Sequence, residues 1–279
     1  MTDPTPLSSA RLTALRPDGS SRPVSRPFAP EVPVALEYNG LSYAVMMASP
    51  SDLEDFISGF ALTEGLASAI DDVSGIDIAQ TDKGWIARAT IASLAVERLL
   101  ERVRTRVAES SCGLCGIDNL EAVAKPLPPV AAHEAIAPAA IFTALAALRD
   151  HQPGNRATGG MHAAAFVDRQ GTILCVREDV GRHNALDKLI GALARSGTAV
   201  ARGFILSTAR CSYEIVEKAV RAGATTLATI SVPTSMAAAR AEAAGLSLFA
   251  LARPDEVLRV TMGRRADDDG AGQEWGERE

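Results

Sequence analysis

The stretch Thr172-Ile-Leu-Cys-Val-Arg-Glu-Asp-Val-Gly-Arg-His-Asn-Ala-Leu-Asp-Lys188 indicates the fold class of this chain. Its first five residues are apolar or β-branched and predict a strand, and Arg182–Arg195 predicts a helix soon after it. Further strands and helices are then predicted in alternation, at Gly203–Ser207, Tyr213–Ala222, Thr226–Ile230, Pro233–Ala244 and Ser247–Ala250. Alternation at this spacing is typical of βαβ units with parallel strands, so we expect an α/β fold.

The same pattern predicts where a ligand would bind. Ligands on such sheets lie at the carboxyl ends of the strands, on the loops that lead into the helices. In this chain those loops are Glu178–His183, Ser207–Ser212 and Ser231–Ser235. Upstream of them, Pro138–Arg149 predicts another helix and Ala163–Val167 another strand.

The first half of the chain has a different pattern. Val32–Tyr38 and Leu41–Met47 are apolar runs joined by Asn39-Gly40, which is a strong hairpin signal. A second hairpin is expected around Asp82-Lys83-Gly84. Two amphipathic helices are also predicted, at Asp52–Thr63 and Ser93–Ala108.

Composition divides the chain into five segments. Residues 1–30 are rich in Pro, Ser and Arg, residues 266–279 are acidic, and both are expected to be disordered. The proline-rich residues 126–137 predict a linker. It separates an N-terminal subdomain, residues 31–125, from a C-terminal subdomain, residues 138–265.

Charge and length exclude several classes of function. The 279 residues carry a net charge of −6, to which the first 30 residues contribute +2, the acidic tail −5 and the body between them −3. A mildly acidic body argues against a nucleic-acid binder, which needs a basic face. No apolar run reaches the roughly 18 residues of a membrane span, and the start has no apolar signal core. Four cysteines in this length do not make a disulfide scaffold, so we expect a soluble protein of a reducing cytoplasm.

Cys112-Gly-Leu-Cys115 is the first candidate for chemistry. Two thiols three residues apart can share a metal, form a disulfide or relay sulfur, and the flanking glycines allow a tight turn. Zinc would need two further ligands, and there is no second Cys-x-x-Cys. Cys211, His162 and His183 leave a metal site open, whereas Cys175 lies in a strand pattern typical of a core thiol.

The strand-to-helix junction at Glu178–Lys188 is the second candidate. Backbone N–H groups at a helix N-terminus favour phosphate, and Arg182 could add positive charge. A carboxylate such as Glu178 or Asp179 can accept from both edge donors of guanine. The alternative is structural: Asp179 caps the helix, and Asp187-Lys188 lies on a solvated face.

Three other loops are also candidates for ligand binding. Thr158–Ala165 is a Gly-Gly turn into a strand of small residues, in which His162 is either a ligand or a hydrogen-bonded structural histidine. Leu206–Ser212 and Ser231–Ser235 are rich in hydroxyl groups. Either could be ordinary helix capping, but two in succession favour an anion site.

These segments, in this order, resemble the FdhD family of formate dehydrogenase accessory sulfurtransferases. Cys-Gly-Leu-Cys-Gly alone is a weak signal, but with Glu-Asp-Val-Gly-Arg-His-Asn-Ala-Leu-Asp-Lys it is highly specific. The resemblance runs from about residue 31 to 262, through Glu31–Asp52, Cys112–Gly116, Thr158–Ala165, Glu178–Gly191, Ser207–Lys218 and Ser231–Ser235.

The resemblance implies a fold and an activity. The second half of the family's fold is similar to cytidine deaminase, with three layers, behind a smaller hairpin-and-helix subdomain. Family members accept sulfur from a cysteine desulfurase as a persulfide. They pass it to the molybdenum (or tungsten) bis-guanine-dinucleotide cofactor before that cofactor enters formate dehydrogenase. The persulfide cysteine matches Cys112, and Cys115 would be a second acceptor or a resolving thiol.

The resemblance also implies which residues bind the cofactor. The family's cofactor segment matches Leu251, Ala252, Arg253, Pro254, Asp255 and Glu256. The family usually has a glycine and a basic or polar residue where this chain has two acids, and acids are unfavourable near a polyanion, so Arg253 is the strongest candidate. From the loops at the sheet edge we add His162, Glu178, Asp179, Gly181, Arg182 and His183, and we expect no metal site.

Rival functions have specific requirements. A zinc deaminase needs a carboxylate two residues after the ligand His and a later Pro-Cys-x-x-Cys, but Ala164 follows His162 at that spacing and no such motif follows. A redox or zinc module would use the two thiols alone. A chaperone that carries the molybdenum cofactor non-covalently would make the thiols incidental. We expect the sulfurtransferase, as a homodimer.

Overall fold

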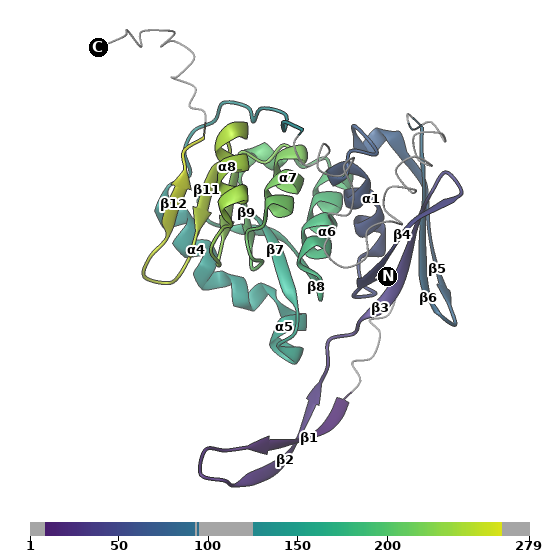
Figure 1. Cartoon of the computed structure of the whole chain (residues 1–279), viewed down its shortest axis with the longest axis vertical. Helices are drawn as coiled ribbons and strands as arrows, with labels where there is room; N and C mark the ends of the chain where they lie inside the picture. The colour runs from purple at the N-terminus through teal and green to yellow at the C-terminus, as the bar shows by residue number, and fades with distance from the viewer. Residues whose placement is uncertain (1–8, 93, 95–124, 264–279) are drawn as a thin grey trace.

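The computed structural model describes residues 9–92, 94 and 125–263. The Cys-x-x-Cys loop with Cys112 and Cys115, nearly all of the predicted helix Ser93–Ala108, and the acidic tail lie outside the described residues. Within them, helices and strands follow the predicted order (Figure 1). No helix in these ranges is long and apolar enough to span a membrane.

The C-terminal half contains six strands: β7 (His162–Val167), β8 (Ile173–Asp179), β9 (Phe204–Ser207), β10 (Thr226–Thr229), β11 (Ser247–Ala250) and β12 (Leu258–Thr261). They form one sheet in the order β12-β11-β10-β9-β7-β8. β9, β10 and β11 are parallel, as predicted, whereas β7 is antiparallel to both neighbours and β12 to β11. A tight turn after Asp168 joins β7 to β8, and a short turn can only reverse the chain.

Helices cover both faces of this sheet (Figure 1). One face is covered by three helices, α6 (Arg182–Arg195), α7 (Tyr213–Arg221) and α8 (Ser235–Ala244). The helix α4 (Pro138–Leu148) packs on the opposite face. Successive residues of β7 contribute to opposite cores, Ala164 and Phe166 to one, Ala165 and Val167 to the other. The expected three-layer α/β arrangement is therefore confirmed.

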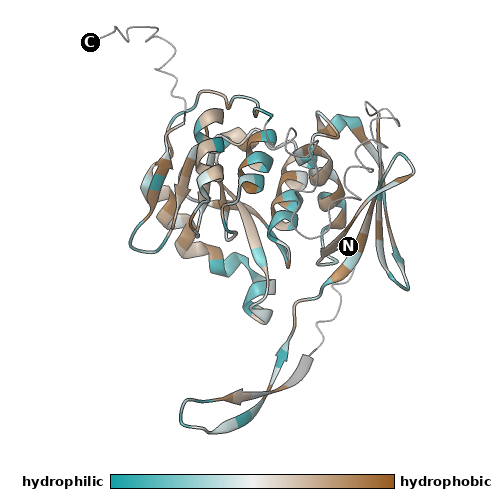
Figure 2. Cartoon of the chain, viewed as in Figure 1, coloured by the Kyte–Doolittle hydropathy of each residue, from teal (hydrophilic) through white to brown (hydrophobic). Residues whose placement is uncertain are grey.

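The proline-rich residues 126–137 contain no helix or strand, but they pack against the sheet. Val130 is buried in the core under α6 to α8, and Ile136 in the core under α4. Val130 N also donates to Ala244 O at 2.8 Å. The short α5 (Pro153–Thr158) follows α4 and, as Figure 2 shows, is far more hydrophilic.

The N-terminal half has its own sheet, made of β3 (Val32–Tyr38), β4 (Leu41–Ala48), β5 (Val73–Thr81) and β6 (Gly84–Ile91). The order β4-β3-β6-β5 contains both predicted hairpins. Asn39 and Gly40 have φ values of 50° and 77°, as the predicted tight turn requires. The helix α1 (Leu53–Thr63) packs on this sheet, with Phe56 and Phe60 in the core.

The two halves meet where α1 crosses α6 (Figure 1). Gly59 of α1 and Gly191 of α6 let the two backbones touch. A Cβ on Gly59 would overlap the carbonyl oxygen of Asp187, and a Cβ on Gly191 would overlap that of Asp55. Only glycine fits at these two positions, so α1 is packed as tightly against α6 as against its own sheet.

The expectation of disorder in residues 1–30 is wrong for the part that the structure describes. β1 (Ser9–Leu15) and β2 (Ser21–Pro27) form an antiparallel hairpin that extends from the body below α5 (Figure 1). Its turn is closed by Ser20 N, which donates to Asp18 Oδ1 at 2.9 Å, and by Gly19 at φ 81°. Because Pro, Ser and Arg dominate this segment, its composition gave no sign of the hairpin, in which Leu12 pairs with Val24 across the two strands.

Candidate functional site

The loops that the sequence singled out do meet at one edge of the large sheet. His162 lies opposite Asp179 at the ends of β7 and β8, and Ala163 N donates to Thr208 Oγ1 at 2.8 Å. Ser231 O accepts from Leu251 N at 3.2 Å, which brings the segment after β11 to the same edge. We call this region the carboxyl edge.

His162 is a half-buried imidazole at this edge. Its Nδ1 lies 3.4 Å from Thr208 Oγ1. Burial lowers the pKa of His162, and the positive charge of Arg182 lowers it further. An anion bound here would stabilise the protonated form, so His162 can change its charge when such a ligand binds.

The first turn of α6 supplies further donors. Its first backbone N–H groups have no partner within the helix. Arg182 Nε is shielded from solvent, and no hydrogen-bond partner for it occurs among the described residues. His183 Nε2 lies 3.1 Å from Glu214 Oε2 at the start of α7, and the hydrogen bond with His183 lowers the pKa of Glu214. The turn therefore combines backbone donors with a guanidinium and an imidazole.

Asp179 and Glu178 do not have the role expected of them. Asp179 is fully buried, and its two oxygens accept from four donors inside the protein. Glu178 accepts from Gly154 N and Asn155 N, each at 2.8 Å, and so holds the start of α5. Both carboxylates already have internal partners, so the hypothesis that one of them reads guanine does not fit this geometry.

The structural alternative, in which Asp187 and Lys188 lie on a solvated face, is wrong as well, because both residues are fully buried. The structure adds to them several polar residues that sequence reasoning missed, above all Ser49 and Lys218. The only sequence signal was a charged pair between Leu186 and Leu189 in a helix. The side of α6 that carries Asp187 and Lys188 is covered by α1, and α1 is distant from α6 in the sequence.

The segment Leu251–Glu256 lies on the carboxyl edge in a constrained conformation. Leu251 has φ 48°, which is costly for a bulky side chain and is often found at functional sites. Ala252 is buried, whereas Arg253, Pro254, Asp255 and Glu256 are all exposed. A turn is closed by Arg253 N, which donates to Glu256 O at 2.8 Å. The guanidinium of Arg253 is therefore accessible to an anionic ligand, and so are both acids.

The described thiols are not suited to metal or sulfur chemistry. Cys211 is fully buried, and burial raises its pKa to about 11. Burial also raises the pKa of the half-buried Cys175. In the parts of the chain that the structure describes, no cluster of three His, Cys, Asp or Glu residues could hold a metal ion. Among the described residues, Cys211 therefore has no set of partners that could complete a metal site.

Comparison with known proteins identifies the family. The model of the FdhD/NarQ family matches residues 29–266. The "Sulfur carrier protein FdhD" of Variovorax paradoxus is 45% identical over 233 residues, which cover 84% of each chain. That of Xanthomonas euvesicatoria is 42% identical over 94% of this chain and 93% of its own.

A solved structure shares the fold. It is the crystal structure of a protein described as a formate dehydrogenase accessory protein, from Desulfotalea psychrophila. It matches 91% of this chain and 97% of its own with a TM-score of 0.71, at 22% sequence identity. Family model, relatives and fold agree over nearly all of the described chain, and the protein therefore belongs to the FdhD/NarQ family.

Proposed function

We propose that this protein is a cytoplasmic sulfurtransferase that carries persulfide sulfur from a cysteine desulfurase to the molybdenum bis-guanine-dinucleotide cofactor, as formate dehydrogenase activity requires. The observation that carries the proposal is the similarity to sulfur carrier proteins FdhD, at 41–45% identity over 81–94% of the chain. The carrier is Cys112, in the Cys-Gly-Leu-Cys-Gly motif, and the protein acts as a homodimer.

The first step is an exchange of persulfide sulfur. The Cys112 thiolate attacks the terminal sulfur of the desulfurase persulfide, the S–S bond of that persulfide breaks, and the desulfurase cysteine leaves as a thiolate. No external oxidant or reductant is needed, because one S–S bond replaces another. A thiolate is the reacting form, so the reaction speeds up wherever positive charge lowers the pKa of the thiol.

Delivery of the sulfur as sulfide needs two electrons. The Cys115 thiolate can supply them by attacking the Cys112 sulfur of the persulfide, which releases HS⁻ and leaves a Cys112–Cys115 disulfide. A cellular dithiol must then reduce this disulfide before the next cycle. In this scheme Cys115 is a resolving thiol and Cys112 is the acceptor.

The carboxyl edge is the place that we assign to the guanine dinucleotides of the cofactor. The support is chemical: the first turn of α6, Arg182 Nε without a partner among the described residues, and exposed Arg253 all favour phosphate. His162 would add positive charge when protonated. Asp179 and Glu178 would support this site from behind rather than contact the ligand.

The test is transfer of sulfur to the purified protein. After incubation with a cysteine desulfurase and cysteine, we expect an adduct of about 32 Da on Cys112, lost on treatment with a thiol reductant. Cys112→Ala should abolish the adduct and the downstream formate dehydrogenase activity, while Cys175→Ala is the matched control and should keep both. A protein that forms no adduct but restores formate dehydrogenase activity without Cys112 and Cys115 would be a non-covalent chaperone instead.

A further inference from the structure

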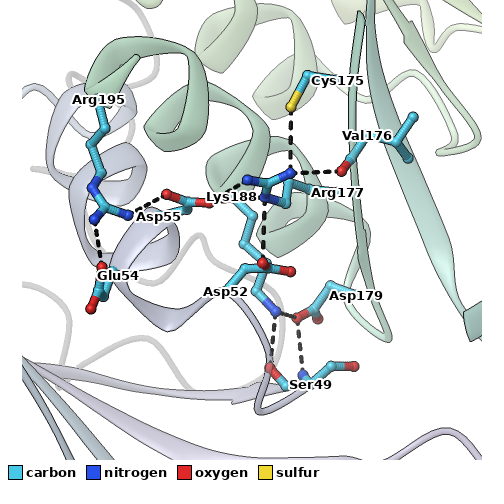
Figure 3. A network of polar contacts seen from close by, with 10 residues as sticks. All are labelled: Ser49, Asp52, Glu54, Asp55, Cys175, Val176, Arg177, Asp179, Lys188 and Arg195. Atoms are coloured by element: carbon cyan, nitrogen blue, oxygen red, sulfur yellow. Dashed lines mark hydrogen bonds and ion pairs between the residues drawn. The ribbon is translucent and has the colours of Figure 1, made fainter. Parts of the chain in front are cut away.

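Asp179 occupies the point where β8 passes into α6. Its Oδ2 accepts from Lys188 Nζ at 2.6 Å and from Ser49 N at 2.9 Å. Its Oδ1 accepts from Gly181 N at 2.7 Å and from Asn184 Nδ2 at 3.0 Å. Four donors on one fully buried carboxylate fix its position from both sides (Figure 3 draws the pairs with Lys188 and Ser49).

The same cluster connects the two halves of the molecule. Lys188 Nζ also donates to Ser49 O at 2.9 Å, and Asn184 Nδ2 also donates to Met47 O at 2.8 Å. Ser49 Oγ in turn accepts from Val180 N at 3.2 Å. The end of β4 and the segment after it are therefore held to the β8–α6 junction by backbone groups on both sides, as Figure 3 shows around Ser49.

This junction leaves little freedom to the first turn of α6. Gly181 is the N-cap of the helix, and a Cβ on it would lie 2.6 Å from Asn184 Nδ2. Arg182 and His183 come directly after this fixed residue. The backbone donors of these two residues are therefore held in place by the contacts of Asp179 with Gly181 before them and Asn184 after them.

We infer that Asp179 and Lys188 are positioning residues for the nucleotide site at the carboxyl edge, and that they hold this site in register with the N-terminal half. The inference rests on the proposed assignment of guanine dinucleotides to that edge. Neither residue touches the ligand. They keep the donors of the first turn in place, and they do so through Ser49, which precedes the helix of the other half.

The chain contains a matched control. Asp187 and Lys218 form a second buried ion pair, at 3.0 Å, which also joins α6 to the N-terminal half. Asp187 Oδ1 accepts from Thr63 Oγ1 at 2.6 Å, and Lys218 Nζ lies 2.8 Å from Glu64 Oε1. None of these contacts reaches the carboxyl edge. Removal of this pair tests the effect of lost stability without a lost positioning contact.

The experiment compares two double variants with the wild type. Asp179→Asn with Lys188→Met removes the first pair, and Asp187→Asn with Lys218→Met removes the second, so neither leaves an unpaired buried charge. Calorimetric titration with GDP measures affinity at a temperature where circular dichroism shows all three proteins to be folded. We expect the first variant to bind GDP about tenfold more weakly and the second within about twofold of the wild type.

A second readout separates positioning from general damage. Both variants should still accept persulfide sulfur on Cys112, because exchange between two thiols needs no bound nucleotide. Ser49→Ala keeps both ion pairs and should weaken GDP binding by about twofold to threefold. This single variant replaces the first double variant in the comparison if that double variant fails to fold.

Equal GDP affinity in the first variant and the wild type would overturn the inference, and so would an equal loss in both double variants. A wild type that takes up persulfide sulfur but does not bind GDP would overturn the assignment of the edge, and the inference with it. A wild type that binds GDP but never forms the persulfide would leave the positioning result intact and overturn the sulfur transfer instead.

Discussion

Asp187 and Lys188 are neighbours in the sequence, yet they belong to two separate buried ion pairs. Lys188 reaches back to Asp179 and Ser49 at the carboxyl edge. Asp187 reaches Lys218 of α7 and Thr63 of α1. A cavity of about 490 Å³ is lined mainly by the segments that follow α1 and α6, at residues 65–70 and 198–200, and of the described cations only Arg221 lines it.

The difference shows that burial of charge does not by itself mark a site. Both pairs are buried, and both connect the same two halves. Of the two pairs, only the first directly supports the first turn of α6, which carries donors without partners among the described residues. That turn lies beside His162, the histidine whose pKa is lowered. We therefore expect the two pairs to contribute similarly to stability and differently to ligand binding.

The largest effect on stability should come from Lys188→Met alone. It leaves the Asp179 carboxylate fully buried without its cation, which typically costs about 3–5 kcal/mol. Urea denaturation at pH 7 measures the loss. Adding Asp179→Asn should recover most of it, because no uncompensated charge then remains. A single variant within about 1 kcal/mol of the wild type would show that solvent reaches Asp179.

Lys218→Met should cost somewhat less, about 2–3 kcal/mol at pH 7, because the Lys218 side chain is 10% exposed, whereas that of Lys188 is fully buried. Burial raises the pKa of Asp187, and the charge of Lys218 opposes that rise. Without Lys218 the folded-state pKa rises further above the unfolded value, so the folded protein binds the proton more tightly. The loss should therefore shrink as the pH falls from 8 to 5. Urea titrations across this range check it, and a loss that is constant with pH would contradict it.

The affinity of the carboxyl edge for GDP should depend on pH. Burial and Arg182 lower the pKa of His162, and His183 lowers it as well, whereas Asp179 and a hydrogen bond with Thr208 oppose them. A bound polyanion would raise this pKa. Binding must therefore take up a proton, and affinity should rise by about threefold to tenfold from pH 8 to pH 6. His162→Gln should flatten most of this slope, and calorimetric titrations in two buffers count the protons.

The smallest effect should come from Glu214→Gln. The side chain of Glu214 is 41% exposed, so its contact with His183, which is an ion pair only when the imidazole is protonated, is screened by solvent and should contribute less than about 1 kcal/mol. The pKa of Glu214 is lowered in the folded state, so its contribution is present above the unfolded pKa and is lost as the pH falls through the folded value. Thermal melts at pH 7 and pH 4 should differ between variant and wild type only at the higher pH.

Much of the fold was predictable because its signals are local. Asn39-Gly40 defined its hairpin, and the alternating pattern after Thr172 defined the order of strands and helices. The antiparallel pairing of β7 with β9 and the edge strand β12 were not predicted. Both depend on pairing across the sheet, which apolar periodicity in one strand does not encode.

The position of the candidate site in the fold was easier to predict from the sequence than the contacts of its side chains. The rule that ligands lie at carboxyl ends of strands selected Glu178–His183, Ser207–Ser212 and Ser231–Ser235, and the structure brings these loops to one edge. His162 was singled out by the Gly-Gly turn before it and Leu251 by the family resemblance. The rule could not show that Asp179 faces inward, because that depends on Ser49 and Met47, about 130 residues upstream. A carboxylate at a strand end looks the same in sequence whether it faces a ligand or a distant loop.

The close crossing of Gly59 and Gly191 has a consequence for how the molecule opens. α1 cannot leave α6 without breaking the contact between their backbones. It would also break the ion pairs that the buried Asp55 forms with Arg177 and Arg195 beside this contact (Figure 3). Amide protons of the two helices should therefore exchange with deuterium through one shared opening event. A division of the chain at its proline tract is then a division of the sequence only, because the unit that unfolds cooperatively includes helices from both sides of it.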